Sequence, residues 1–134
     1  KGAEIRRAYM DAIPGLEDLV KDTRRVAERG SIRAIDKRQI HVDKEHKALN
    51  CLLQGSAAVI AKRWLLLTDS KLRGFTHERY AFVHDEQILG APLENAEYLC
   101  DVCKLSALEA GEYYNLRLPI EADAQIGVNW AEVH

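Results

Sequence analysis

The chain has 134 residues, of which 47% are hydrophobic and 30% charged, a composition typical of one globular domain with a real core rather than of a disordered segment. Its apolar runs, such as residues 65–67, fall far short of the roughly 20 residues that cross a bilayer. No charged-then-apolar amino terminus suggests a secretory signal, so we expect a soluble intracellular protein. The net charge of −2 conceals an asymmetry, because residues 1–74 carry 16 Lys and Arg against 10 Asp and Glu, whereas residues 75–134 carry 3 against 11.

The amino-terminal part is expected to form two helices and a hairpin. Residues 3–12 favour a helix, and Pro14 begins a second helix that should reach about Glu28. Apolar and β-branched residues alternate in residues 31–35 and 39–42 on either side of a polar turn. This pattern predicts a short antiparallel hairpin.

A long helix is expected over about residues 44–72. The segment contains no Pro, and its apolar residues recur at three- and four-residue steps, as on the buried face of a helix. Asp43 is placed to cap the start of this helix and Gly74 to end it.

The acidic half of the chain is expected to form a second hairpin, a helix and a strand. Residues 79–90 contain two short strands around a tight, charged turn at residues 84–86. An amphipathic helix should follow from Leu93 to about Ala110, closed by Gly111, and a strand over residues 114–120. The order of elements predicts an α+β fold with helices packed on an antiparallel sheet.

The turn between the strands of the second hairpin carries two adjacent carboxylates, Asp85 and Glu86. Neighbouring carboxylates repel each other unless a cation lies between them. Mg²⁺ bound to phosphates takes only one or two protein carboxylates, so one Asp on a tight hairpin is a candidate half-site for a metal. A solvated turn is the alternative, because turns readily accept Asp.

Three polar residues, His46, Asn50 and Gln54, recur at four-residue steps on the expected long helix. Their side chains would form one stripe beside the apolar face. Amide and imidazole donors suit the DNA minor groove, where every base pair presents acceptors. An ordinary polar helix face is the alternative.

The charge asymmetry and the cysteines are less specific signals. A basic half suits phosphates and an acidic half suits divalent cations, although ordinary solvated faces show the same asymmetry. Three cysteines are too few for a disulfide framework. Cys100 and Cys103 are expected to face the core of their helix, because a zinc site would need two further ligands.

Three segments, read in order, resemble parts of the A-family DNA polymerases. Residues 49–58, LNCLLQGSAA, resemble a helix in which an Asn and a Gln four apart precede small residues. Residues 82–86, FVHDE, resemble the palm motif that presents a catalytic aspartate, and residues 129–134, NWAEVH, resemble the family's usual ending. The likeness covers essentially the whole chain and is closest to the phage replicative branch.

The resemblance implies an incomplete polymerase domain. Residues 1–30 would be a helical segment from the end of the fingers, and residues 31–134 the carboxyl-terminal half of the palm, with a palm-type antiparallel sheet packed against long helices. The first residue, Lys1, is not Met, which also suggests that the chain is cut from a longer protein.

The resemblance also implies a role for each candidate residue. Asp85 would bind catalytic Mg²⁺, one of two ions in the complete enzyme, while His84 and Glu86 would support its geometry and the primer end. Primer-template contacts would come from the stripe, and a DNA backbone contact from Arg38. The residues implied to touch DNA are Arg38, His46, Asn50 and Gln54. Lys37 stands where the family commonly has Gly, so the first hairpin turn is expected to be built differently.

The implied function is template-directed DNA synthesis by two-metal nucleotidyl transfer in a full-length parent. Its partners would be primer-template DNA and deoxynucleoside triphosphates in the cytoplasm of a bacterial or phage-infected cell, with a processivity factor as a candidate further partner and no membrane. The second carboxylate would lie upstream, so the isolated chain is expected to be inactive and to self-associate through its incomplete palm. The alternatives are a non-catalytic nucleic-acid-binding module on a palm scaffold and a small metal-dependent nuclease.

Overall fold

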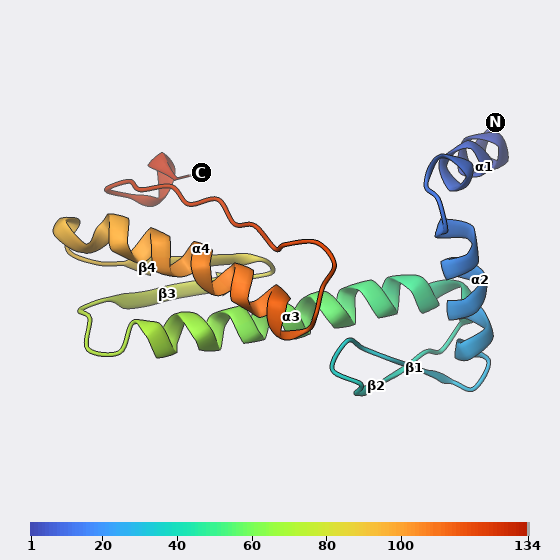
Figure 1. The fold of residues 1–134 in the computed structure, drawn as a ribbon. Coiled ribbons are helices and arrows are strands. Elements are labelled where there is room, and N and C mark those ends of the chain that lie inside the picture. The colour runs from blue at the N-terminus through green and yellow to red at the C-terminus, as the bar shows by residue number, and fades with distance from the viewer. Residues whose placement is uncertain (134) are drawn as a thin grey trace. The chain divides into compact units, whose positions relative to one another are not determined.

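The computed structural model describes residues 1–133, which form helices and two separate antiparallel hairpins (Figure 1). His134, the last residue of the ending that resembles the polymerase family, lies outside the described residues. The chain divides into two compact units, Lys1–Ala57 and Ala58–His134. None of the helices within residues 1–133 combines the length and the apolarity needed to cross a membrane.

The first unit begins with two helices and a hairpin, as the sequence predicts. These elements are α1 (Gly2–Ala12), α2 (Leu16–Ala27), β1 (Ser31–Arg33) and β2 (Gln39–His41). Gly30 has a φ of 78°, a left-handed conformation that glycine adopts without steric cost, and its N–H donates to the carbonyl of Ala27 over 2.8 Å. The chain therefore turns from α2 directly into β1.

A small apolar core joins α2, the hairpin and the start of the long helix. Its buried members are Ala27, Ile32, Val42 and Ala48, and Ile40, Cys51 and Leu52 pack against them. In the hairpin, Ile32 pairs with Ile40, so these two side chains lie on the same face. The apolar alternation seen in the sequence thus places one face of the hairpin against the helices.

The long helix α3 (Ala48–Lys71) starts four residues later than the sequence predicts. The preceding turn, η1 (Glu45–Lys47), is a short 3₁₀ helix. Asp43 does not cap α3, because its carboxylate accepts a hydrogen bond from Nζ of Lys47 over 3.0 Å. The predicted end is confirmed, since Gly74 follows the last turn with a φ of 85°.

The second unit contains the later turns of α3, a hairpin and a helix. The hairpin consists of β3 (Glu78–Val83) and β4 (Glu86–Gly90), and the short η2 (Leu93–Asn95) leads into α4 (Ala96–Tyr113). Leu72, Leu99 and Val102 form the buried core, against which Leu89 and Ala91 of the hairpin side pack. Leu89 of β4 therefore packs against α4 and against Leu72, the residue that follows α3.

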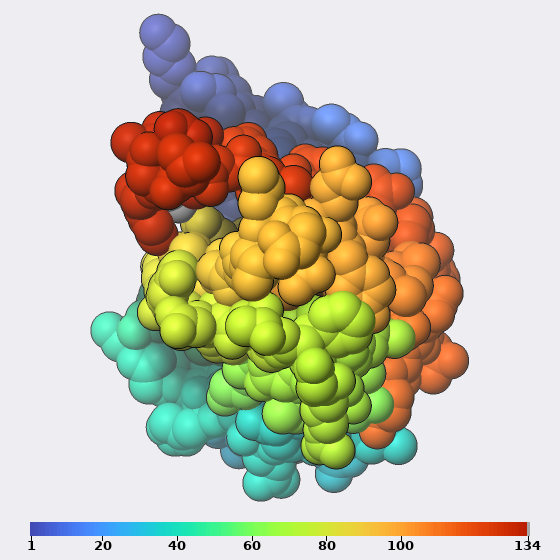
Figure 2. All heavy atoms as spheres, turned by 90° about the vertical axis from the view of Figure 1, so that its left-hand side faces the viewer, coloured from blue at the N-terminus to red at the C-terminus, as the bar shows by residue number. Residues whose placement is uncertain are grey.

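Aromatic stacking closes one end of the second unit. The rings of Phe75, just after α3, and Tyr98, in the first turn of α4, lie 4.5 Å apart at an interplanar angle of 23°. Figure 2 shows the segment after α3, in yellow-green, beside the start of α4, in gold. The loop that leads into β3 is thus fixed to α4.

The end of α4 differs from the sequence prediction. Gly111 does not close the helix but lies buried within it, and a Cβ there would approach Cγ1 of Ile120 to 2.8 Å. The helix continues to Tyr113, and the chain turns at Asn115, whose φ is 52°. The N–H groups of Asn115 and Leu116 donate to the carbonyls of Glu112 and Gly111. This is the Schellman pattern, in which Asn replaces the commoner Gly.

The strand predicted over residues 114–120 is wrong, because none of residues 114–133 forms a strand. The Schellman turn redirects the chain so that Ile120 packs on Gly111, and its backbone pairs with no other strand. The single sheet implied by the sequence is likewise replaced by two separate two-stranded sheets. The α+β class itself is confirmed, with small antiparallel sheets among helices.

Candidate functional site

The acidic turn of the second hairpin has only two residues, His84 and Asp85. Val83, the last residue of β3, pairs with Glu86, the first residue of β4. Glu86 therefore belongs to a strand rather than to the tip where the sequence placed it, and it is half-buried, while His84 and Asp85 are exposed. The carboxylate of Asp85 is thus presented to solvent at the end of a paired hairpin.

The backbone of this turn is strained at His84, which has a φ of 54°. A residue with a Cβ adopts this left-handed region at a cost of about 1–2 kcal/mol. Such conformations persist where the surrounding structure determines them, and they occur often at functional sites. Here the pairing of β3 with β4 on either side of the turn holds His84 in this conformation.

An exposed carboxylate is a ligand that Mg²⁺ prefers, so the chemistry of Asp85 fits a metal half-site. Among residues 1–133, no group of three or more His, Cys, Asp and Glu side chains is placed to hold a metal ion. A metal site that uses Asp85 therefore needs ligands other than the side chains that lie near it within residues 1–133, such as water, phosphate oxygens or a further carboxylate.

The hairpin packs on α3 through an aromatic contact. The ring of Phe82, in β3, meets the ring of Trp64 edge-on with centroids 6.3 Å apart. Nε1 of Trp64 donates a hydrogen bond to the carbonyl of Cys103 in α4 over 2.8 Å. Trp64 thus connects the acidic hairpin to both helices of the second unit, which limits the freedom of the strand that leads to Asp85.

The polar stripe predicted on the long helix is only partly confirmed. Asn50 and Gln54 lie one turn apart on α3 and are both exposed. His46 is also exposed but belongs to η1, before the helix begins, so its place on the long helix is corrected. Of the three residues, only Asn50 and Gln54 therefore share one face of the α-helix, as residues four positions apart do.

The small residues that follow Gln54 let the first hairpin approach α3. A Cβ at Gly55 would overlap Cδ1 of Ile40 in β2, and Oγ of Ser56 accepts a hydrogen bond from the backbone N–H of Ile35 over 3.3 Å. Gly55 and Ser56 therefore have a packing role, which fixes the hairpin turn against the helix that carries Asn50 and Gln54.

The turn of the first hairpin holds Arg38 through Asp36. Nε of Arg38 donates to Oδ2 of Asp36 over 2.5 Å, and the backbone N–H of Arg38 donates to Oδ1 over 3.2 Å. Burial raises the pKa of the Asp36 carboxyl, but the hydrogen bonds from Arg38 outweigh it and hold this pKa below its ordinary value. Lys37, between them, has a φ of 69°, so the turn uses the left-handed conformation that glycine favours.

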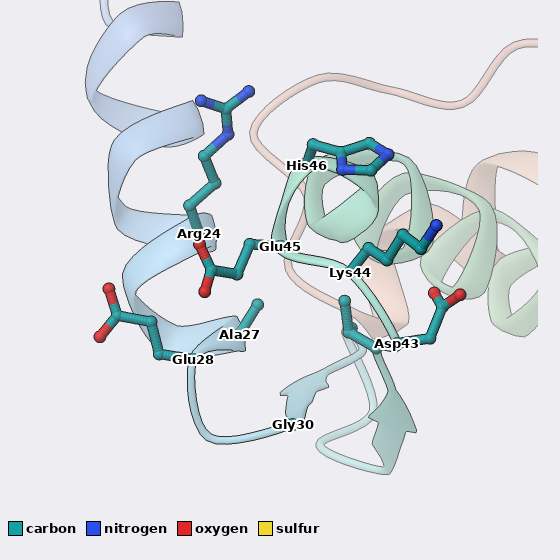
Figure 3. A pocket seen from close by; sticks show the side chains of 9 residues that line it. Arg24, Ala27, Glu28, Gly30, Asp43, Lys44, Glu45 and His46 are labelled. Carbon is teal, nitrogen blue, oxygen red and sulfur yellow. The ribbon is translucent and has the colours of Figure 1, made fainter.

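A surface cleft of about 480 Å³ opens beside η1 in the first unit (Figure 3). Figure 3 shows Arg24 on α2 and Glu28 just after it, across from Lys44, Glu45 and His46 on the segment that leads into α3. The cleft is lined by Arg24, Ala27, Glu28, Gly30, Val42, Asp43, Lys44, Glu45 and His46. The cleft carries charges of both signs. The sequence did not predict that the cations Arg24 and Lys44 lie beside His46, because no regular spacing relates residues of α2 to residues of η1.

The cysteines of α4 are poor candidates for chemistry. Burial raises the pKa of the Cys103 thiol to about 11 and also raises the pKa of the Cys100 thiol. A thiol with a raised pKa is protonated at neutral pH, and the thiolate is the form that attacks or binds metals. Both side chains are half-buried, which supports the packing interpretation.

The candidate residues fall into two sets. The first unit contains Arg38, His46, Asn50 and Gln54, and the second contains His84, Asp85 and Glu86. The first set lies on the first hairpin, η1 and α3, and the second lies on the second hairpin alone. All of these side chains are exposed except that of Glu86, which is half-buried. The first set offers hydrogen-bond donors and one guanidinium, and the second offers carboxylates.

The fold is similar to part of a solved polymerase. The structure is similar, over 84% of the chain and with a TM-score of 0.75 at 25% sequence identity, to 22% of the solved POL domain of Pol1 from M. smegmatis in complex with DNA primer-template and dNTP. The sequence model of DNA polymerase family A matches residues 2–132, and the chain belongs to this family.

Its relatives include phage and bacterial enzymes, as the resemblance predicted. The DNA-directed DNA polymerases of Enterobacteria phage T3 and Escherichia phage T7 are each 28% identical over 158 residues, which cover 100% of the chain and 22% of each relative. The thermostable DNA polymerase I of Thermus aquaticus is 31% identical over 125 residues, 93% of the chain and 12% of the relative. The chain thus spans about a fifth of the phage polymerases that it matches.

Proposed function

We propose that this chain is the carboxyl-terminal part of a DNA-directed DNA polymerase, in which Asp85 binds a catalytic metal ion during template-directed nucleotidyl transfer. The observation that supports this most is the exposed carboxylate at a two-residue hairpin tip, in a chain that matches DNA polymerase family A over residues 2–132. In this proposal, residues 1–30 end the fingers and residues 31–134 form the second half of the palm.

The chemistry follows from what the residues of the turn offer. Bound Mg²⁺, as two ions in the complete enzyme, would supply Lewis-acid stabilisation of the charge on the reacting phosphate. Asp85 would hold one ion with its carboxylate, and the left-handed backbone of His84 would set the direction of that side chain. Glu86, at the start of β4, would support the turn from the paired strand. A second carboxylate would come from outside residues 1–134.

The residues of the first unit would bind the primer-template. The side chains of Asn50 and Gln54 can donate hydrogen bonds to the acceptors that every base pair presents in the minor groove, which would test pair geometry without reading sequence. Arg38 would contact a backbone phosphate and His46 the DNA beside the cleft. The exposure of all four side chains supports these contacts.

The isolated chain would display half of the metal site without carrying out synthesis. Several large apolar side chains are exposed in the second unit, among them Leu66, Tyr80, Leu93 and Leu118. Exposed apolar area of this kind favours association, so we expect the separated chain to self-associate. A processivity factor would bind the complete polymerase rather than supply a residue of this site.

The proposal is tested with the complete gene product and with the chain alone. The purified complete protein is expected to extend a primer with Mg²⁺ and deoxynucleoside triphosphates in the order that the template dictates, whereas the 134-residue chain is expected to bind primer-template without extension. A complete product that binds DNA but adds no nucleotide would contradict the proposal and favour the non-catalytic binding module.

Replacement of Gln54 by Ala in the complete polymerase is expected to reduce discrimination at the primer end. The amide would no longer donate to the minor groove, and one such hydrogen bond contributes about 1 kcal/mol, or roughly a fivefold change. The measurement is the ratio of matched to mismatched primer extension. Lys62→Ala, an exposed change on the same helix, is the control, and an unchanged ratio for the Gln54 variant would remove Gln54 from the proposed contact.

A further inference from the structure

A polar network joins the acidic hairpin to α3. Arg79, in β3, donates from Nη1 to Oε1 of Gln87 in β4 over 2.6 Å, and its Nη2 donates to Oδ1 of Asp69 in α3. Nε2 of Gln87 donates in turn to Oγ1 of Thr68 over 3.3 Å. We call these four residues the hairpin clamp, because they hold both strands to two adjacent residues of one helix.

The hairpin clamp is more enclosed than an ordinary surface ion pair. Thr68 is completely buried, and the side chains of Arg79 and Asp69 are 22% and 50% exposed. Exposed ion pairs fix geometry weakly because water competes for each partner, whereas a network that includes buried groups specifies one arrangement, since each unmade bond leaves a desolvated polar atom. Arg79 therefore fixes where the hairpin lies on α3.

The strand register links the hairpin clamp to the metal-binding turn. Gln87 pairs with Phe82 and lies two residues after Asp85, and Arg79 pairs with Leu89, the next residue on the same face of β4. A register shift between Arg79 and Ala81 adds a residue to β3, and bulges of this kind change the direction of neighbouring side chains. Gln87 thus lies two residues after Asp85 along the chain, in the paired ladder whose last pair, Val83 and Glu86, borders the turn.

We propose that Arg79 is a positioning residue for Asp85, which acts by fixing Gln87 and the β4 strand on α3 so that the carboxylate meets its metal ion in one orientation. This inference rests on the proposed function of Asp85. Arg79 touches neither metal nor DNA in this account. Asp69 orients the guanidinium, and Thr68 receives the second end of the Gln87 amide.

The test compares Arg79→Met with Arg73→Met in the complete polymerase. Met keeps much of the length of the arginine stem and removes the guanidinium. Arg73 is an exposed arginine of the same unit and lies outside the hairpin clamp, so its variant controls for the loss of one positive charge.

Arg79→Met is expected to lower kcat by about tenfold or more, the usual effect of removing a group that orients a metal ligand. The Mg²⁺ concentration for half-maximal extension should rise several-fold, while the Kd for primer-template stays within about twofold of the parent.

A lysine at the same position separates positioning from folding. Arg79→Lys retains a charge for Asp69 but lacks the forked donors that reach Asp69 and Gln87 together, so it should restore the Mg²⁺ requirement only in part. If Arg79→Met lowered extension only in proportion to its unfolded fraction, with an unchanged Mg²⁺ requirement, Arg79 would be a stabilising residue and the inference would be overturned. Extension by Arg79→Met equal to that of Arg73→Met would overturn it as well.

The variant Asp85→Asn, assayed beside these, distinguishes the two proposals. Loss of extension in Asp85→Asn together with normal metal dependence in Arg79→Met would remove the positioning role and leave the proposed function intact. Retention of extension in Asp85→Asn would instead remove the metal-binding role of the turn, whatever Arg79→Met shows.

Discussion

Asp85→Asn in the complete polymerase is expected to reduce primer extension by about a thousandfold. Asn preserves the shape of the side chain but removes the negative charge that binds a divalent cation. Metal stabilisation of the transferring phosphate contributes several kcal/mol, and each 1.36 kcal/mol corresponds to about a tenfold change in rate. Single-turnover extension of a labelled primer measures this effect at saturating nucleotide.

The binding of DNA should survive this substitution, because Asp85 is exposed at a turn and no described hydrogen bond of the hairpin depends on it. The Kd for primer-template is expected to stay within about twofold of the parent value. Asp101→Asn, at an exposed position of α4, removes the same charge in the same unit and should leave extension unchanged. Near-normal extension by Asp85→Asn would remove Asp85 from the catalytic site.

Leu72→Ala is expected to produce the largest loss of stability, about 3 kcal/mol in the free energy of unfolding. Leu72 is fully buried and forms the core of the second unit with Leu99 and Val102. Truncation of a buried leucine removes apolar contacts and leaves a cavity, which typically costs about 2–5 kcal/mol. Urea denaturation followed by circular dichroism measures the change.

The matched control is Leu66→Ala on α3, where the leucine is 61% exposed. Its substitution should change the free energy of unfolding by less than about 0.5 kcal/mol, because surface changes usually do, and Ala suits a helix. Equal effects of the two substitutions would show that the contacts of Leu72 do not determine the stability of this unit.

Local patterns were sufficient to predict most of the helices and both hairpins. The three- and four-residue apolar steps of α3 and the alternation around Asp36 and Asp85 are periodic signals that tertiary packing reinforces. The end of α4 was mispredicted because two opposing signals lay within five residues. Gly111 resembles a helix terminator in sequence, but its lack of a side chain allows the close approach of Ile120. The helix runs on to Tyr113, and the left-handed Asn115 turns the chain away.

The strand expected after α4 illustrates a limit of local reasoning. Residues 114–120 have strand-like composition, yet a strand needs a partner, and the Schellman turn directs this segment onto Gly111. The start of α3 was missed for a related reason. Asp43 has the residue type of a cap, but a lysine one turn later binds its carboxylate.

The candidate site was predictable where its residues are contiguous and not where they come together through folding. The residues of the acidic turn, His84 and Asp85, are adjacent in sequence and lie at the tip that the pattern predicted. The hairpin clamp joins residues that are 8, 10 and 19 positions apart, and no periodicity relates them. Neither Arg79 nor Gln87 would be selected without the strand register.

The turn at Lys37 has a consequence for how the first hairpin responds to its solution. A left-handed backbone costs lysine about 1–2 kcal/mol that glycine does not incur, and this cost is independent of ionic strength. Lys37 also adds a positive charge to the tip, where Asp36 already balances the charge of Arg38. Salt weakens the attraction between such an exposed charge and an anion, and at 0.1 M the attraction is largely screened beyond about 10 Å. In concentrated salt, Lys37 therefore retains its conformational cost while its electrostatic contribution fades.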